Sequence, residues 1–209
     1  MTRTTVPVTH ELITRLRPPC SDAYGGRWVS QQLEEGGSCG RVALVEDRPV
    51  GIVLYAPPNA ASAAADQPTA PVSEDALLMV ALWVLPEQRG GGVGRLLVQA
   101  MAADVLDRPG VRAVECFARR GPERARGAGG ADALVPAAFL TRVGFRVERA
   151  HPRVPRMRMD LRTTVSWRDE VGATWERLRD AVRPAPARPR PIGTRNVDGP
   201  ATPVGSPAR

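Results

Sequence analysis

The sequence contains no lysine, so each of its 29 basic residues is an arginine. This absence excludes a Walker phosphate-binding loop, which requires a lysine followed by serine or threonine. Aromatic residues are also scarce, at 4% of the 209 residues, and alanine and aliphatic side chains must therefore fill the interior. The length suffices for one sizeable hydrophobic core, and we expect a single folded domain.

Cysteine and histidine are too few and too widely spaced for a metal centre. Cys20, Cys39 and Cys116 form no Cys-x-x-Cys pair, and the two histidines, His10 and His151, are isolated. We expect reduced thiols and no bound metal. Cys116 falls in a predicted strand, where a cysteine commonly packs in the core, and no histidine lies near it in the sequence to activate it.

No segment is apolar over the length of a signal peptide or a membrane span, which favours a soluble, cytoplasmic protein. The net charge of +7 would suit anionic partners such as nucleic acid, an anionic membrane or the phosphates of coenzyme A. However, no basic run alternates with aromatic residues, and no recognition-helix or RNA-binding sheet pattern occurs. An all-arginine composition indicates coding bias, and a nucleic-acid-binding function would rest on charge alone.

The middle of the chain, from Ala76 to Leu106, predicts a strand, a glycine-rich turn and a helix. Apolar residues are nearly continuous from Leu77 to Leu85, as in a strand that is buried on both faces, and Pro86 ends the run. After the turn, residues recur at helical spacing with one polar interruption: Leu97, Ala100, Met101, Asp104 and Val105.

The glycine-rich turn, residues 90–95, has the properties of an anion-binding site. Glycine has no Cβ, so the backbone can come close to a ligand, and the first N–H groups of the following helix lack intrahelical partners. These N–H groups and the helix dipole attract negative charge. No acidic residue occurs from Gln88 to Gln99, whereas Arg89 and Arg95 add positive charge. The turn is therefore predicted to hold an anionic group.

Alternative glycine motifs match this turn less well. A dinucleotide-binding fingerprint could start at Gly92, but Leu97 occupies the position of its third glycine. A simple glycine-rich hairpin would not need an amphipathic helix directly after it. Arg89, Gly92 and Gly94 instead form the pattern Arg-x-x-Gly-x-Gly after a strand that ends in Val-Leu-Pro-Glu. This pattern resembles the acyl-CoA-binding motif of the GCN5-related N-acetyltransferase (GNAT) superfamily.

Two further segments extend the resemblance. Residues 40–55, GRVALVEDRPVGIVLY, resemble the antiparallel hairpin of that family, and residues 139–145, FLTRVGF, resemble its short helix ending in Gly-Phe. With the turn, they follow the order of the family over residues 40–161. The resemblance implies an α/β (α+β) GNAT fold, with a central, mixed, mostly antiparallel sheet that contains a splayed pair of parallel strands and is flanked by helices.

The resemblance also implies acetyl-CoA as co-substrate and assigns the two parts of its site. The pantetheine arm would enter the gap between the splayed strands and pair with main-chain groups of Leu82, Trp83, Val84 and Leu85. The pyrophosphate would be held by Arg89, Gly90, Gly91, Gly92, Val93, Gly94 and Arg95.

Local patterns predict the remaining elements. We expect an edge strand at 11–16, helices at 27–35 and 137–143, and strands at 41–45, 50–55, 111–117, 145–148 and 156–161. The strand at 111–117 should run parallel to the central strand because a helix connects the two. The last two strands should form an antiparallel hairpin with Met157, Met159 and Leu161 facing inward. The loop at 119–135 is either simply solvated or a lid over the acceptor.

The C-terminal part of the chain divides into two predicted segments. Residues 164–182 have helical spacing and two tryptophans, and such a helix would pack on its own domain or join a homodimer interface. From residue 183 onward, proline and glycine prevent a packed core, which predicts a disordered basic tail. We therefore expect an acyltransferase domain at 1–182 and a tail at 183–209.

The chemistry that the resemblance implies is direct attack of an acceptor amine on the thioester. A lysine-like amine has a pKa of about 10.4, so its neutral form costs more than about 4 kcal/mol near pH 7, and a general base must help. Candidate bases are Glu74 and Asp75, before the central strand, and Glu115 on its parallel neighbour. Many family members place a tyrosine acid after the phenylalanine of the short helix, where this chain has Leu140. A base matters more than an acid, because the thiol can leave largely as thiolate.

The sequence thus predicts an N-acetyltransferase that transfers an acetyl group from acetyl-CoA to an amine of a small molecule or peptide. The alternative is a catalytically weak acyl-CoA-binding regulatory module, which Leu140 permits. The acceptor stays open among small amines, antibiotics, amino acids, and peptide or protein N-termini.

Overall fold

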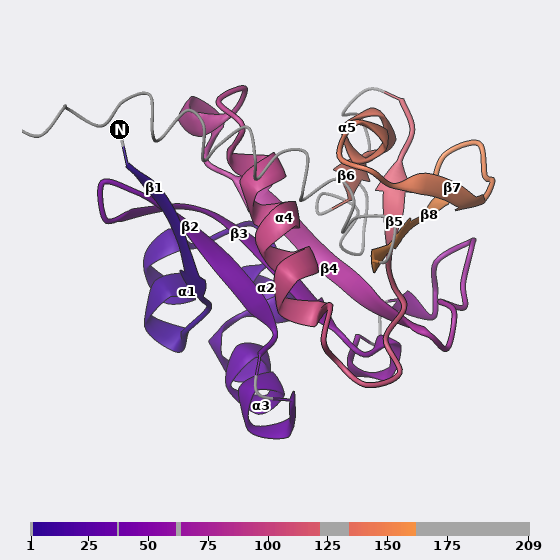
Figure 1. The fold of residues 1–209 in the computed structure, drawn as a ribbon, viewed down its shortest axis with the longest axis horizontal. Helices are drawn as coiled ribbons and strands as arrows, with labels where there is room; N and C mark the ends of the chain where they lie inside the picture. The colour runs from indigo at the N-terminus through magenta and orange to yellow at the C-terminus, as the bar shows by residue number, and fades with distance from the viewer. Residues whose placement is uncertain (1, 37, 62–63, 122–133, 162–209) are drawn as a thin grey trace, which may run out of the picture. The chain divides into compact units, whose positions relative to one another are not determined.

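The computed structural model of the chain describes residues 2–36, 38–61, 64–121 and 134–161 (Figure 1). All of these lie within the first of two compact units, Met1–Val171. The predicted helix at 164–182 and the predicted tail at 183–209 lie outside the described residues, and so does most of the loop at 119–135.

One mixed sheet forms the centre of the described part. Its strands follow the order β1-β2-β3-β4-β5-β8-β7, and β6 pairs with β5. Neighbours along this order are antiparallel except β4 and β5, which are parallel, as are β5 and β6. The strands are β1 (Arg3–Pro7), β2 (Gly40–Val45), β3 (Arg48–Ala56), β4 (Ala76–Val84), β5 (Ala113–Arg119), β6 (Val135–Pro136), β7 (Arg146–Arg149) and β8 (Arg156–Asp160). The predicted mixed, mostly antiparallel sheet is confirmed.

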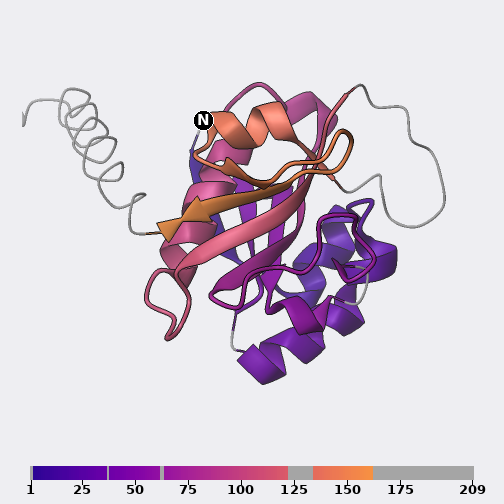
Figure 2. The ribbon, with the colours of Figure 1, turned by 90° about the vertical axis from the view of Figure 1, so that its right-hand side faces the viewer.

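Helices cover both faces of the sheet (Figures 1 and 2). On one face lie α4 (Val93–Val105) and α5 (Ala137–Arg142), and on the other lie α1 (His10–Leu16), α2 (Ser21–Tyr24) and α3 (Gly26–Gly36). Two short 3₁₀ turns, η1 (Pro58–Ala60) and η3 (Pro86–Gln88), follow β3 and β4. The helices predicted at 27–35 and 137–143 correspond to α3 and α5.

The predicted closing hairpin is also confirmed. β7 and β8 pair antiparallel, and β8 in turn pairs antiparallel with β5. Met157, Met159 and Leu161 are all buried, as their alternation with charged residues indicated.

The edge strand predicted at 11–16 is wrong, because these residues form helix α1. The side chain of Thr9 caps the helix by accepting a hydrogen bond from the Leu12 N–H at 3.2 Å. Ile13 and Leu16, three residues apart, then reach the core from the same helix face. The edge of the sheet is instead β1, which pairs antiparallel with β2.

The parallel strands β4 and β5 diverge soon after they meet. They pair only at three positions, the last of which joins Leu78 to Glu115. Nearby, the register of β4 against β3 shifts, since Leu54 is paired with Ala81 and Tyr55 with Met79, which leaves Val80 as an extra residue in β4. A β-bulge of this kind bends its strand, and it accounts for the turning of β4 away from β5. The predicted splayed pair is therefore present.

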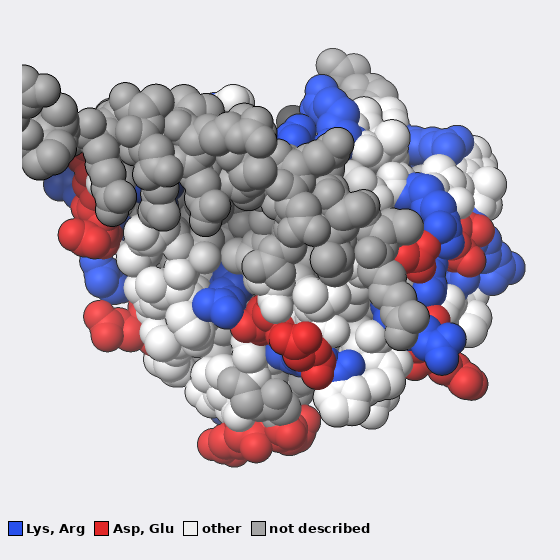
Figure 3. All heavy atoms as spheres, in the orientation of Figure 1, with Lys and Arg blue, Asp and Glu red and all other residues white. Residues whose placement is uncertain are grey.

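Charges of both signs share the surface. On the face shown in Figure 3, arginine and acidic side chains of the described residues are interspersed rather than separated. In the described ranges, none of the helices combines the length and the apolarity that a membrane crossing requires.

Candidate functional site

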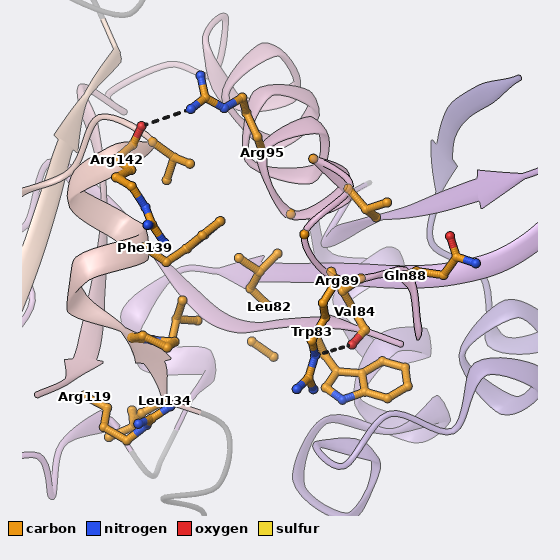
Figure 4. A pocket seen from close by; sticks show the side chains of 18 of the residues that line it. Leu82, Trp83, Val84, Gln88, Arg89, Arg95, Arg119, Leu134, Phe139 and Arg142 are labelled. Atoms are coloured by element: carbon orange, nitrogen blue, oxygen red, sulfur yellow. Dashed lines mark hydrogen bonds between the residues drawn. The ribbon is translucent and has the colours of Figure 1, made fainter. Parts of the chain in front are cut away.

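A cavity of about 570 Å³ lies where β4 and β5 diverge (Figure 4). This volume falls within the range of small-molecule sites. Its wall combines Leu82, Trp83 and Val84 of β4 with the glycine-rich turn, the start of α4, one side of α5 and the end of β5. Pro19 and Cys20, before α2, complete it from the other side of the sheet. The cavity therefore joins segments that are far apart in the sequence.

The start of α4 offers backbone donors to this cavity. Gly92 is the N-cap residue, and no side chain caps the helix, while the Leu96 N–H is the first to bond back into it, to the Gly92 carbonyl at 3.0 Å. The N–H groups of Val93 and Gly94 are therefore without intrahelical partners, and both residues line the cavity. No acidic residue occurs in the first turn to offset the dipole. This end of the cavity is suited to an anion.

Two glycines of the turn are needed for different reasons. Gly92 has a φ of 87°, in the left-handed region that other residues rarely adopt. Gly94 lies under α5, and a Cβ there would be 3.1 Å from Cζ of Phe139. The ring of Phe139 thus packs directly over the backbone that carries the open N–H groups.

The charged side chains that line the described part of the cavity are all arginines: Arg89, Arg95, Arg119 and Arg142. Arg89 donates through Nε to the Val84 carbonyl at 3.1 Å, which ties the turn to the end of β4. Arg95 donates to the Arg142 carbonyl at 3.5 Å and so bridges α4 and α5. The cavity is consequently electropositive.

The structure brings nearly all predicted cofactor-site residues together. Leu85 and Gly91 are the exceptions, since neither lines the cavity. The Leu85 N–H is used by the sheet, where it donates to the Val50 carbonyl at 2.9 Å. Beyond Leu78, the edge of β4 that faces β5 has no strand partner among the described strands, so its main-chain groups border the cavity.

Sequence reasoning missed Arg3, which supports the turn from behind. Its guanidinium donates to the Gly91 carbonyl, 88 positions along the chain. β1 holds Arg3 there through pairing with Val45 of β2. No local pattern could reveal this contact, whereas Phe139 and Arg142 belong to a motif that the sequence displayed.

The three candidate bases lie away from the cavity, at the paired end of β4 and β5. Glu74 is exposed, Asp75 accepts from both terminal nitrogens of Arg158 at 2.9 and 3.0 Å, and Glu115 accepts from the same arginine at 3.1 Å. The hydrogen bond from Arg158 holds the pKa of Asp75 below its ordinary value. Glu115 is fully buried and also lies 3.2 Å from Nε of Arg156. A catalytic role for these carboxylates has no support from their position, because two of them neutralise arginines instead.

The cavity has no obvious proton-transfer group within the described residues. Leu140 is fully buried in the core, and Phe139 takes the place beside the cavity. Cys20 is the remaining titratable side chain besides the arginines, and burial raises the pKa of its thiol to about 11. It therefore stays protonated near neutral pH.

Comparisons with known proteins agree with this geometry. The model of the acetyltransferase (GNAT) family matches residues 9–127. Ard1 from Thermoplasma volcanium is 14% identical, with 77% of this chain and 98% of that chain covered and a TM-score of 0.53. The loading GNATL domain of CurA from Lyngbya majuscula is 15% identical, with 78% and 100% covered and a TM-score of 0.54. The GphF GNAT-like decarboxylase in complex with isobutyryl-CoA is 20% identical, with 76% and 99% covered and a TM-score of 0.52.

At these identities the solved structures demonstrate a shared fold only. The family assignment rests on the match to the family model. A comparison with curated proteins gives no significant match. The family match covers more than half of the chain and includes the glycine-rich turn and the diverging strands. The chain therefore belongs to the acetyltransferase (GNAT) family, and this membership supports acyl transfer as its general activity.

Proposed function

We propose that the protein is an acetyl-CoA-dependent N-acetyltransferase. The observation that carries the proposal is the cavity at the divergence of β4 and β5, with open N–H groups of α4 at one end and unpaired main-chain edge of β4 along its side. The residues present fit coenzyme A, because a diphosphate needs donors without opposing carboxylates and an amide-containing arm needs a free strand edge.

Each part of the site has a defined task. The N–H groups of Val93 and Gly94 would bind the pyrophosphate, with Arg89 and Arg95 supplying positive charge. The edge of β4 at Leu82 to Val84 would pair with the amides of the pantetheine arm and so orient it through the gap. Phe139 and Leu82 exclude water from one side of the cavity.

Acetyl-CoA supplies an activated acyl group as a thioester. A neutral acceptor amine attacks the carbonyl carbon, the new C–N bond forms as the C–S bond breaks, and the amine proton passes to the departing thiolate, by way of water. An acceptor that starts as an ammonium ion first releases one further proton to solvent. A thiol has an ordinary pKa of about 8.5. The positive potential of the arginines around the cavity favours its thiolate form.

A second candidate is an acyl-CoA-binding regulatory module. It is favoured by one observation, which is that no carboxylate, histidine or tyrosine lines the described part of the cavity. The two candidates share the coenzyme site and differ only in turnover.

Calorimetric titration with coenzyme A and acetyl-CoA tests the site itself. Gly94→Glu should remove the saturable heat, because the new side chain brings bulk and negative charge under Phe139. Gln99→Glu adds the same charge to the same helix outside the cavity and should bind like the unchanged protein. Equal affinity of Gly94→Glu and the unchanged protein would refute the assignment.

Release of the CoA thiol with a panel of amines, together with product mass, then separates the two candidates. Because the chain has no lysine, its own acetylation is restricted to the α-amino group, so the panel has little background from the enzyme. Binding without thiol release across the panel would select the regulatory module.

A further inference from the structure

The cavity passes from one face of the sheet to the other. Val93 and Phe139 belong to the apolar layer beneath α4 and α5, whereas Cys20 and Trp83 belong to the layer beneath the N-terminal helices. Figure 4 shows Arg95 on α4 at one end and Arg119 with Leu134 at the other. The gap between β4 and β5 connects the two ends.

The two ends have different partners if the proposed function holds, and the present inference rests on that function. The pyrophosphate occupies the end at α4, so the arm that leads through the gap delivers the thioester toward the opposite face. The acceptor must then approach from the end formed by Pro19, Cys20, Trp83 and Arg119.

Arg119 lines the cavity at the end of β5, beside Leu134 (Figure 4). Its guanidinium donates through Nη1 to the Gly121 carbonyl at 2.9 Å and forms no ion pair with a described carboxylate. Glu115, four residues earlier on β5, is already held by Arg158 and Arg156. The thiol of Cys20 is neutral, so nothing nearby in the described part offsets the charge of Arg119.

From this arrangement we infer that the acceptor is an α-amine that carries a carboxylate, and that Arg119 binds the carboxylate. A guanidinium pairs with a carboxylate through two parallel hydrogen bonds, which also orients the partner. Polyamines and aminoglycosides are cations. The arginines that line the described part of the cavity would repel them.

An α-amine acceptor is also consistent with a cavity whose described wall contains no general base. An α-amine of a peptide has a pKa of about 7.7–8.0, so roughly a tenth of it is neutral at pH 7, against roughly one part in 2,500 for a lysine-like amine of pKa about 10.4. Such an acceptor can lose its proton to water without a carboxylate beside it. The carboxylate can come from an acidic residue at a peptide N-terminus, to which this pKa argument applies. It can also come from a free amino acid, whose amine is more basic because its own carboxylate stabilises the ammonium form.

The test measures kcat/KM for matched acceptors by CoA thiol release and product mass. The peptide pair is Glu-Ala-Ala-amide and Gln-Ala-Ala-amide, the amino-acid pair is alanine and alaninamide, and spermidine serves as the cationic acceptor. For each acceptor kcat/KM is referred to the concentration of its neutral amine, because alaninamide is a weaker base than alanine. In the unchanged protein, the carboxylate-bearing member of at least one pair should be preferred, and the pair that discriminates identifies the source.

Arg119→Gln should lower kcat/KM for the preferred acidic acceptor about 10- to 100-fold, the loss expected for hydrogen bonds to a charged group, and should leave its neutral partner within about threefold. Its acetyl-CoA affinity should not change. Arg120→Gln removes the same charge from the neighbouring exposed residue outside the cavity and should behave like the unchanged protein.

Five outcomes would overturn the inference. Spermidine as the best acceptor, no preference within either pair, or an equal loss for both members of a pair in Arg119→Gln would do so while the N-acetyltransferase function stands. Weaker acetyl-CoA binding by Arg119→Gln would place this arginine in the coenzyme site. If acetyl-CoA binds but no acceptor releases CoA, the proposed function fails and this inference fails with it.

Discussion

Single residues set the shape of the cavity end at α4. A side chain at Gly92 would have to adopt a left-handed backbone, which costs about 1–2 kcal/mol, whereas the Cβ of a side chain at Gly94 would crowd the ring of Phe139 at 3.1 Å. The sequence shows the same residue type at both positions. Only the contacts separate a conformational requirement at Gly92 from a spatial one at Gly94.

Arg3 provides a prediction about the support of the glycine-rich turn. Arg3→Ala should weaken coenzyme A binding about 2- to 10-fold, because the Gly91 carbonyl loses its donor and the turn loses a constraint on the direction of its N–H groups. Calorimetric titration measures the change in Kd. The midpoint of thermal unfolding should hardly move, since Arg3 lies on an exposed edge of the sheet.

Arg48→Ala is the matched control for this prediction. It removes the same charge from the exposed start of β3, at the same end of the sheet, since Arg3 and Arg48 both pair with Val45, and should leave the Kd unchanged. An equal loss of affinity in both variants would mean that Arg3 acts through general charge and not through its contact with Gly91.

Pairs of secondary-structure elements determine where the sheet opens. The bulge at Val80 turns β4 away, and an ion cluster holds the other end of the pair closed. In this cluster Arg158 of β8 contacts Asp75 before β4, Glu115 of β5 and Asp160 of its own strand. The hydrogen bonds of Arg158, above all the one to Asp75, raise the pKa of its guanidinium, which therefore stays charged.

Removal of Arg158 should therefore destabilise the fold strongly. Arg158→Met should lower the free energy of unfolding by about 3 kcal/mol, because Glu115 is fully buried and would lose part of its compensation. Urea unfolding measures the loss. The double variant Arg158→Met/Glu115→Gln should recover part of it, since the buried charge is then gone as well.

Arg146→Met gives the comparison for this cluster. Arg146 also pairs with Asp160, but its side chain is 62% exposed, and the loss should stay below about 1 kcal/mol. Equal effects of Arg158→Met and Arg146→Met would show that burial does not govern the strength of the cluster.

At the scale of the whole molecule, a carboxylate in α4 links this helix to the sheet. Asp104 interrupts the apolar face of α4, and it accepts hydrogen bonds from Tyr55, from Ser38 at 2.7 Å and from Arg41 at 2.6 Å, with Arg108 at 3.4 Å. Burial alone would raise the pKa of Asp104, but these hydrogen bonds hold it below its ordinary value. Helix α4 is thereby attached to β2 and β3.

Stability should consequently fall in acid. Below about pH 5 the unfolded chain binds more protons than the folded one, so the contribution of Asp104 is complete above a carboxyl pKa of about 3.9 and is lost as the pH falls through the lower folded value. Asp104→Asn should reduce the free energy of unfolding at pH 6 by roughly 1–3 kcal/mol. The free energies of unfolding at pH 6 and pH 3 should also differ less in this variant than in the unchanged protein.

Thermal and urea unfolding at both pH values measure this effect. Asp47→Asn, in the exposed turn between β2 and β3, keeps a left-handed backbone that asparagine tolerates and should retain the pH dependence. An unchanged pH difference in Asp104→Asn would assign the acid sensitivity to other carboxylates, among them Asp75.

Much of the fold was predictable because its signals are local. The continuous apolar run of β4, the glycine-rich turn and the periodicity of α4 each occupy a few neighbouring residues, and so do the two hairpins. The prediction at 11–16 was wrong because the apolar residues of this segment, Leu12, Ile13 and Leu16, have helical spacing, and the side chain of Thr9 caps the helix. The boundaries at 1–182 and 183–209 stay predictions.

The order of residues along the chain was sufficient for the family, the class of fold and the anion-binding character of the turn, since each depends on residues that are close in sequence. Tertiary structure alone decided that Arg3 reaches the turn, that Cys20 and Arg119 line the same cavity, and that Glu115 faces arginines instead of the cavity. These outcomes depend on strand register and on the divergence of β4 from β5, which arise from long-range pairing that no local pattern encodes.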